Sequence, residues 1–240
     1  EGVRRALPVG GLCYTILAVP NHASRAWISV EPEARSPRQS FRRLYPERRR
    51  ALVVPGLIPE VEGRAIELGW EETRGTGVSA RAQFRYTRTE QYLEWVSSGD
   101  WITPRQRASV DLLRGRVSLA APLASWWRQE ATLEMANVVG PTGAGPVAYL
   151  PAVRAGLGAA WTWSAWTFSL DWRGQTGQEA GDGGPSLGGF SVVSARVTSP
   201  PMGGLVAEAG VDNLLKERYE DRRGEVREQP LVYGRMRAEF

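Results

Sequence analysis

The sequence predicts an all-β chain that spans a membrane as part of an antiparallel β-barrel. Apolar and polar residues alternate through Val153–Trp163 and Trp166–Gln175, which places the apolar side chains on one face of each strand. Tryptophans bracket that face, with Trp161, Trp163 and Trp166 at one end and Trp172 at the other. The connections between such runs are alternately short and long. An apolar band between aromatic girdles, with short turns on one side and long loops on the other, is typical of transmembrane barrels.

The alternation, followed from the N-terminus, predicts about eleven strands. These are Leu12–Val19, Ala26–Glu31, Glu60–Glu72, Val78–Tyr86, Arg105–Ala121, Trp127–Val139, Val153–Trp163, Trp166–Gln175, Phe190–Thr198, Leu205–Asn213 and Leu231–Phe240. With the last strand running toward the periplasm, the short connections 73–77, 122–126, 164–165 and 199–204 lie there. The long connections 32–58, 87–104, 140–150, 175–189 and 214–230 are then external loops.

An odd number of strands does not close a bacterial barrel in the usual even-numbered way. An open edge in hydrocarbon leaves unpaired backbone amides, each costing several kcal/mol. The chain begins with Glu1 and shows no signal peptide. We therefore expect a mature product or a fragment, with a fragment favoured and the remaining wall upstream of Glu1.

Composition excludes several classes of protein. Of the 240 residues, 42% are hydrophobic, yet no stretch approaches the roughly 20 apolar residues that a spanning helix needs. The net charge of +4 is scattered, so the concentrated basic stripe of a nucleic-acid-binding protein is missing. Cys13 and His22 are each the single residue of their type, and no catalytic set stands out. We expect no metal site, no cofactor and no enzymatic activity.

Two predicted external loops carry candidate substrate-binding residues. Tyr92, Trp95 and Trp101 form an aromatic group in one loop, which either grips a ligand or packs the loop on its neighbours. In another loop Tyr45 and Arg48 belong to an arginine-rich segment. Guanidinium groups suit oxyanions, so this segment either binds lipopolysaccharide phosphates or an anionic ligand, or is a solvated basic loop.

The polar faces of the C-terminal strands carry charges of both signs. We expect these side chains to line the barrel interior as a cross-strand charge lattice, with direct substrate contact as the alternative. The residues concerned are Arg154, Asp171, Arg173, Arg196, Glu208, Arg235, Arg237 and Glu239.

The C-terminal region carries motifs of a known family. The segment from Ala209 to Tyr219 resembles the penultimate strand of TonB-dependent outer-membrane receptors, and Asn213, Leu214 and Tyr219 match it. Leu215 replaces the usual Phe, and Lys216 replaces the usual Asp. Pro230 and Phe240 match the family's closing strand, but the Gly-Arg pair after the proline is absent. Upstream, Pro59-Glu60 and Glu67-Leu68-Gly69 resemble the stretch where an external loop re-enters the barrel.

The resemblance covers residues 57–240 most clearly, whereas residues 1–56 fit by pattern alone. It implies that residues 1–240 are one partial barrel domain, about the last half of a 22-stranded barrel whose plug is absent from this chain. It also implies uptake of a scarce large solute, such as a ferric siderophore, cobalamin or haem, across a Gram-negative outer membrane. The implied partners are membrane lipid, the upstream barrel and plug segments, and the TonB complex. A passive or structural outer-membrane barrel is the alternative, and a soluble β-sandwich binding module is a third possibility.

Overall fold

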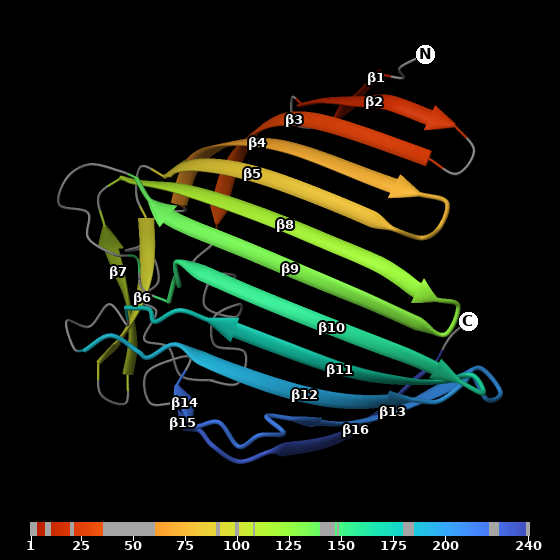
Figure 1. The fold of residues 1–240 in the computed structure, drawn as a ribbon. Helices are drawn as coiled ribbons and strands as arrows, with labels where there is room; N and C mark the ends of the chain where they lie inside the picture. The colour runs from red at the N-terminus through yellow and green to blue at the C-terminus, as the bar shows by residue number, and fades with distance from the viewer. Residues whose placement is uncertain are drawn as a thin grey trace.

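The chain folds into one large antiparallel sheet (Figure 1). The computed structural model describes residues 4–7, 11–19, 22–35, 61–89, 92–98, 101–107, 109–139, 147, 149–179, 185–220 and 226–238. No helix in these segments is long and apolar enough to cross a membrane. The sheet's twelve strands, in spatial order, are β1 (Arg4–Leu7), β2 (Gly11–Val19), β3 (His22–Arg35), β4 (Val61–Arg74), β5 (Ser79–Thr89), β8 (Val110–Ala124), β9 (Trp127–Val138), β10 (Val153–Trp163), β11 (Trp166–Gln175), β12 (Phe190–Thr198), β13 (Leu205–Asp212) and β16 (Leu231–Ala238).

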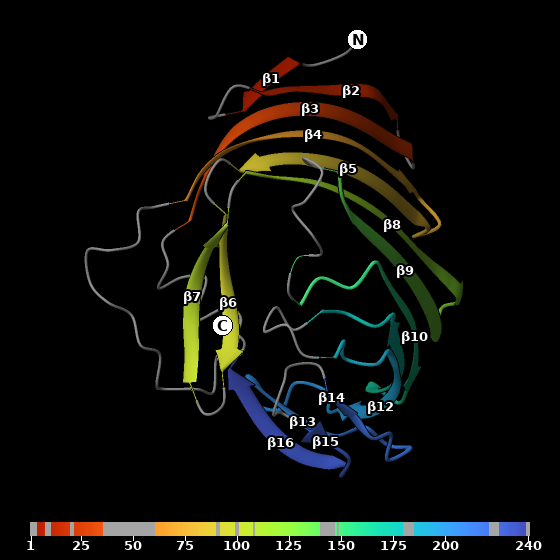
Figure 2. The ribbon, with the colours of Figure 1, turned by 90° about the vertical axis from the view of Figure 1, so that its left-hand side faces the viewer.

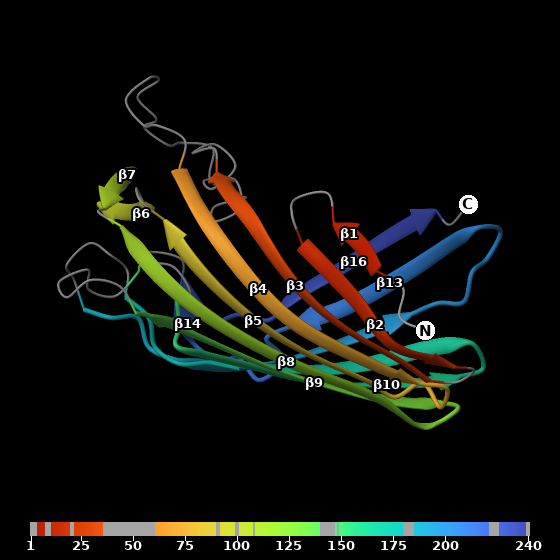
Figure 3. The same ribbon diagram turned by 90° about the horizontal axis from the view of Figure 1, so that it is seen from above.

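The sheet curls into an incomplete cylinder, so it has a concave and a convex face (Figure 2). Strand order follows chain order except where a small hairpin is inserted between β5 and β8 and between β13 and β16. Strands β1 and β16 are the two edges of the sheet. Figure 3 shows β2–β5 and β8 running side by side and crossing the direction of β13 and β16, as strands tilted around a curled sheet do.

The two inserted hairpins lie at one end of the strands, which we call the loop end (Figure 1). The first pairs β6 (Tyr92–Ser98) with β7 (Trp101–Arg107), and the second pairs β14 (Tyr219–Glu220) with β15 (Val226–Arg227). The opposite end, which we call the turn end, carries the tight connections at 75–78, 125–126, 164–165 and 199–204. The expected alternation of short and long connections is confirmed for these segments.

The connection between β10 and β11 shows how the register is set. Trp163 pairs with Trp166 across a turn of only Ser164 and Ala165. Both turn residues have positive φ, 48° and 68°, which is the backbone of a type I′ turn and matches the natural twist of paired strands. Because a slip of one residue would move the tryptophans of both strands to the other face, this turn pins the face assignment.

The structure corrects several predicted boundaries. The large sheet has twelve strands rather than eleven, because the short β1 precedes the first predicted strand. The single run predicted at Arg105–Ala121 is divided, with residues 105–107 in β7 and residues 110–121 in β8, since three consecutive polar residues at 105–107 interrupt the alternation. The predicted loop 87–104 contains β6 and most of the β6–β7 hairpin. Strand β3 is longer than predicted at both ends and begins at His22.

The convex face is apolar and exposed. Every second side chain of β10 and β11 points outward from this face. Examples are Leu157, Phe168 and Leu170, which are 55%, 42% and 41% exposed. Neighbouring strands continue the same surface with Leu68, Phe84, Val117, Leu119 and Leu133. A contiguous exposed surface of this kind requires an apolar environment or a partner.

Tryptophans lie at both borders of this apolar surface, as the sequence predicts. At the turn end Trp163 is 75% exposed beside the partly buried Trp161, and Trp166 faces Trp163 across the turn. Trp172 lies nearer the loop end, where its indole Nε1 donates a hydrogen bond to Ser191 Oγ at 2.7 Å. Amphipathic rings at two levels match the interfacial girdles of transmembrane strands.

Candidate functional site

The concave face carries the polar side chains, and cross-strand register brings opposite charges together. Asp171 and Arg196 form an ion pair at 3.6 Å between Oδ2 and Nη2 on neighbouring β11 and β12. Arg235 of β16 lies opposite Glu208 of β13, with Nη2 and Oε1 2.9 Å apart. The expected charge lattice is therefore present at these positions. The exposed pair of Asp171 and Arg196 contributes little to stability individually, so its main effect is to make the interior polar.

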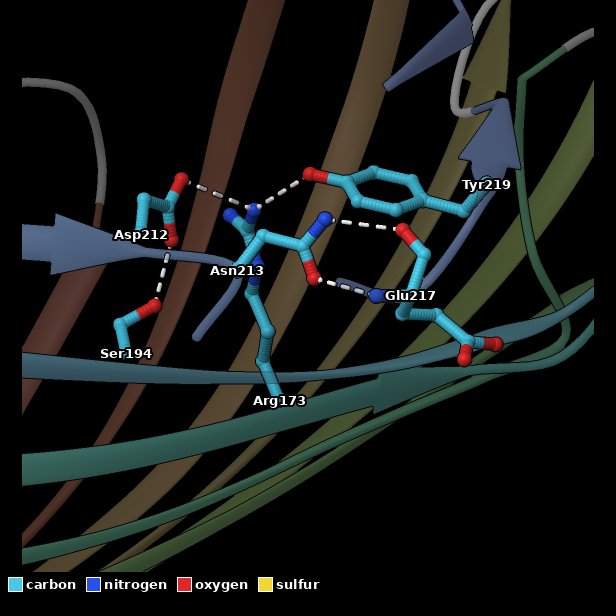
Figure 4. Close-up of polar contacts among 6 residues, drawn as sticks. All are labelled: Arg173, Ser194, Asp212, Asn213, Glu217 and Tyr219. Atoms are coloured by element: carbon cyan, nitrogen blue, oxygen red, sulfur yellow. Dashed lines mark hydrogen bonds and ion pairs between the residues drawn. The ribbon is translucent and has the colours of Figure 1, made fainter. Parts of the chain in front are cut away.

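A second group of polar contacts lies near the loop end and joins three strands to the segment after β13 (Figure 4). Arg173 of β11 directs Nη2 toward Asp212 Oδ2 at 3.5 Å and donates a hydrogen bond to the Tyr219 hydroxyl at 3.1 Å. Ser194 of β12 donates to the same aspartate. Strands of the opposite wall lie behind these side chains in Figure 4, so the group faces the interior of the cylinder.

Tyr219 fixes the return of the chain from β13. Its side chain is buried, and its ring lies 4.3 Å from that of Phe190, centroid to centroid. The hydroxyl accepts the hydrogen bond from Arg173, so the polar tip is also satisfied. The tyrosine thus anchors the β14–β15 hairpin against β11 and β12 inside the loop end.

Asn213 closes the turn between β13 and Tyr219. Its Nδ2 donates to the carbonyl of Glu217 and its Oδ1 accepts from the N–H of Glu217, both at 2.8 Å. Its backbone has φ of 57°, a left-handed conformation that Asn tolerates better than most residues. The N–H of Leu214 donates to the Val193 carbonyl at 2.7 Å, which holds the turn against β12. The Asn and Tyr of the C-terminal motif therefore have a structural explanation here.

Substitution at Asn213 should separate the two contributions to this turn. Asn213→Ala loses both side-chain hydrogen bonds and places alanine in the left-handed region, which together should cost about 2–4 kcal/mol. Asn213→Gly loses the same bonds but adopts this backbone freely, so it should cost about 1–2 kcal/mol less than the alanine variant. Urea unfolding of the folded protein in lipid vesicles measures both. Equal losses for the two variants would show that the backbone conformation contributes nothing.

A third cluster is built around Trp27 on the concave face of β3, β4 and β5. The indole lies over Gly69 of β4, where an added Cβ would collide with the ring. Trp27 Nε1 donates to Glu67 Oε1 at 2.9 Å, and Glu67 also accepts from Gln83 at 3.0 Å and Arg85 at 3.2 Å. The missing side chain at Gly69 is what allows a tryptophan to lie flat on the interior wall.

The structure describes three of the five candidate substrate-binding residues. Tyr92 and Trp95 lie in β6 and Trp101 begins β7, so all three belong to the hairpin at the loop end. Trp95 is paired with Pro104, and Trp101 with Ser98. Tyr45 and Arg48 lie outside the described residues, as does Phe240. Of the family motif, Asn213 and Tyr219 are buried in the turn described above, and Leu214 is exposed.

Sequence reasoning missed the Trp27 cluster entirely. The sequence pattern places Trp27 only within a strand, and the motif includes Gly69 without indicating a partner for it. The cluster could have been predicted only from the register between β3 and β4. That register places Trp27 directly opposite Gly69, and Glu67 opposite Ser29. The β6–β7 hairpin had a local signal, since Gly99-Asp100 between two runs rich in aromatic and β-branched residues is typical of a hairpin.

Comparison with solved structures shows where this architecture occurs. Neither a family model nor a curated protein sequence matches the chain. Among solved structures, the copper transporter OprC aligns with a TM-score of 0.68 at 14% identity, covering 96% of this chain and 39% of that one. The pyoverdine outer membrane receptor FpvA from Pseudomonas aeruginosa PAO1 aligns with a TM-score of 0.59 at 13% identity, covering 96% and 35%. The chain has the barrel fold of TonB-dependent outer-membrane receptors.

The FrpB iron transporter from Neisseria meningitidis aligns similarly, with a TM-score of 0.60, 9% identity and coverage of 94% of this chain and 38% of that one. The chain therefore spans less than two-fifths of the length of these TonB-dependent receptor structures. At such identities the likeness concerns the fold. The predicted fold class, a partial antiparallel barrel with the fold of these receptors, is confirmed.

Proposed function

We propose that this chain is part of the wall of an outer-membrane receptor that takes up a scarce large solute in a Gram-negative bacterium. The observation that carries the proposal is the division of the sheet into two faces. The convex face is apolar and exposed between tryptophans, and the concave face holds ion pairs. This division suits a sheet with lipid outside and a polar interior. The fold shared with OprC, FpvA and FrpB supports a receptor.

The open edges of the sheet define the partners that this function requires. Strands β1 and β16 each leave one side of their backbone without a neighbouring strand in the large sheet. In hydrocarbon these groups must be paired, because each unsatisfied one costs several kcal/mol. We propose that further barrel strands of the same protein supply that pairing, and that a plug segment and the TonB complex supply gating and energy.

Substrate contact in this proposal is made at the loop end. Tyr92, Trp95 and Trp101 belong to the β6–β7 hairpin, and we propose that this element contacts the solute. The arginine-rich segment with Tyr45 and Arg48 is the second contact region that we propose. Most of the strand surface faces lipid or holds the charge lattice, so in this proposal the solute is first contacted by these inserted segments.

Replacing Tyr92, Trp95 and Trp101 together with Ala should weaken solute binding while leaving assembly in the outer membrane intact. Aromatic anchors in an interface contribute about 2 kcal/mol or more each, so the uptake rate at limiting solute should fall strongly. Growth on the limiting nutrient, with surface abundance measured in parallel, tests this. Unchanged uptake at normal abundance would contradict it and direct the search to Tyr45 and Arg48.

Deletion and energy-coupling experiments test the function itself. Uptake of the limiting nutrient should depend on the gene and should stop when TonB is removed, with the protein still found in the outer-membrane fraction. A passive channel predicts gene-dependent uptake that persists without TonB. That second outcome would replace the receptor by a channel while leaving the fold unchanged.

A further inference from the structure

The interior wall formed by β3, β4, β5 and β8 carries more arginines than carboxylates. Three successive rows of side chains cross these strands on the concave face, as the register shows. Their charged members are five arginines against two glutamates: Arg25, Arg81, Arg85, Arg114 and Arg116, with Glu67 and Glu71. Each row thus has one surplus positive charge. This contrasts with β11–β13 and β16, where Asp171 and Glu208 each have an arginine partner.

Both glutamates of these three rows are already engaged. Glu71 Oε2 lies 2.6 Å from Arg25 Nη2. Glu67 accepts hydrogen bonds from Trp27, Gln83 and Arg85, so its two oxygens have three donors. These carboxylates hold the wall together and leave little capacity to neutralise further guanidinium groups.

Two of the surplus positive charges, those of Arg81 and Arg116, are exposed on the interior face. Both side chains are exposed, and no ion pair joins either of them to a carboxylate within the part of the chain that the structure describes. The Arg81 guanidinium lies over the Trp27 ring at 5.3 Å from its centroid, which orients it without removing its charge. Arg116 lies between Gln83 and Glu134 in register, but Glu134 also faces Arg154 on its other side.

The spacing of the two exposed arginines suits a small anion. Arg81 pairs with Ser118, two residues along β8 from Arg116, so the two arginines are diagonal neighbours. Diagonal positions on adjacent strands lie roughly 7–8 Å apart. Guanidinium groups at that spacing can hold a solute with two or three oxyanion groups by charge-assisted hydrogen bonds. An acidic protein surface would need a wider array of free cations than these two.

We propose that Arg81 and Arg116 form an anion-binding site on the interior wall, and that the solute taken up carries carboxylate or phosphate groups. The inference rests on the receptor function proposed above and specifies its substrate class. Trp27, seated on Gly69, positions Arg81, and Glu67 positions Trp27. The solute contacts the two arginines after it has passed the loop end.

Calorimetric titration of the native protein, purified from the outer membrane in detergent at low ionic strength, tests the site. The probes are citrate and inorganic phosphate, with uncharged glycerol as the negative control. We expect saturable citrate binding that the double variant Arg81→Gln, Arg116→Gln weakens at least about tenfold, because two charge-assisted hydrogen-bonding groups are lost. The matched double variant Arg64→Gln, Arg128→Gln removes two charges from exposed arginines elsewhere on the sheet and should bind citrate as the native protein does.

Three results would overturn the site: no binding of either probe by the native protein, unchanged binding by the Arg81 and Arg116 variant, or equal weakening by the control variant. Circular dichroism of each variant verifies that it is folded. Phosphate binding without citrate binding would support the site and assign it to phosphate-bearing solutes. The receptor proposal fails separately, by absence from the outer-membrane fraction or by uptake that does not depend on the gene.

Discussion

Arginine in place of Leu170 is expected to cost about 2–4 kcal/mol of folding free energy in a lipid bilayer. Leu170 lies on the convex face of β11, between Trp166 and Trp172, with Ala159 and Ala195 as its partners on the neighbouring strands. A guanidinium at this level of the bilayer would lose its hydration. The cost should appear as a lower urea midpoint for folding into lipid vesicles.

The adjacent residue supplies the control. Asp171 lies on the concave face and pairs with Arg196, so Asp171→Asn should lose only an exposed ion pair, worth about 1 kcal/mol or less. Equal effects of Leu170→Arg and Asp171→Asn on folding in vesicles would contradict the assignment of the two faces of β11.

Alanine in place of Tyr219 is the second large expected effect. The ring is 5% exposed and packs against Phe190, and truncation of a buried aromatic side chain costs about 3–5 kcal/mol. Because the tyrosine anchors the β14–β15 hairpin, the loss should appear as protease cleavage within residues 214–230 and as faster amide exchange there. The large sheet should remain assembled.

Phenylalanine at the same position is the matched variant. Tyr219→Phe keeps the ring against Phe190 and removes only the hydroxyl that accepts from Arg173, so it should cost about 1 kcal/mol. If Tyr219→Phe opened the hairpin as widely as Tyr219→Ala, the hydrogen bond rather than ring packing would hold it closed.

The strands from Val153 to Thr198 were predicted with the same boundaries that the structure shows. Their alternation is nearly unbroken, tryptophans mark the ends, and the two-residue turn leaves no freedom of register. The N-terminal part was predicted less well, because β1 is short and β3 continues through Pro32, where the alternation is weak. The β6–β7 hairpin does not belong to the large sheet, so the pattern of membrane-spanning strands does not predict it.

The interior was predictable only in part. Alternation alone indicates that Asp171, Arg196, Glu208 and Arg235 point inward, and the structure confirms their pairing. The position of the Trp27 ring depends on Gly69, which lies opposite it on another strand. That pairing is set by the register between distant segments, which alternation does not predict. Likewise, the motif identified Asn213 and Tyr219, but their contacts with Glu217, Phe190 and Arg173 required the fold.

Spin labels along β11 in lipid vesicles test the central claim, that one face of this sheet meets lipid and the other a polar interior. After replacement of the single native Cys13, one label is placed at a time from Thr167 to Trp172. The account predicts high collision rates with oxygen at positions 168, 170 and 172, and with a water-soluble nickel chelate at 167, 169 and 171. The same pattern shifted by one residue, or no alternation at all, would contradict it.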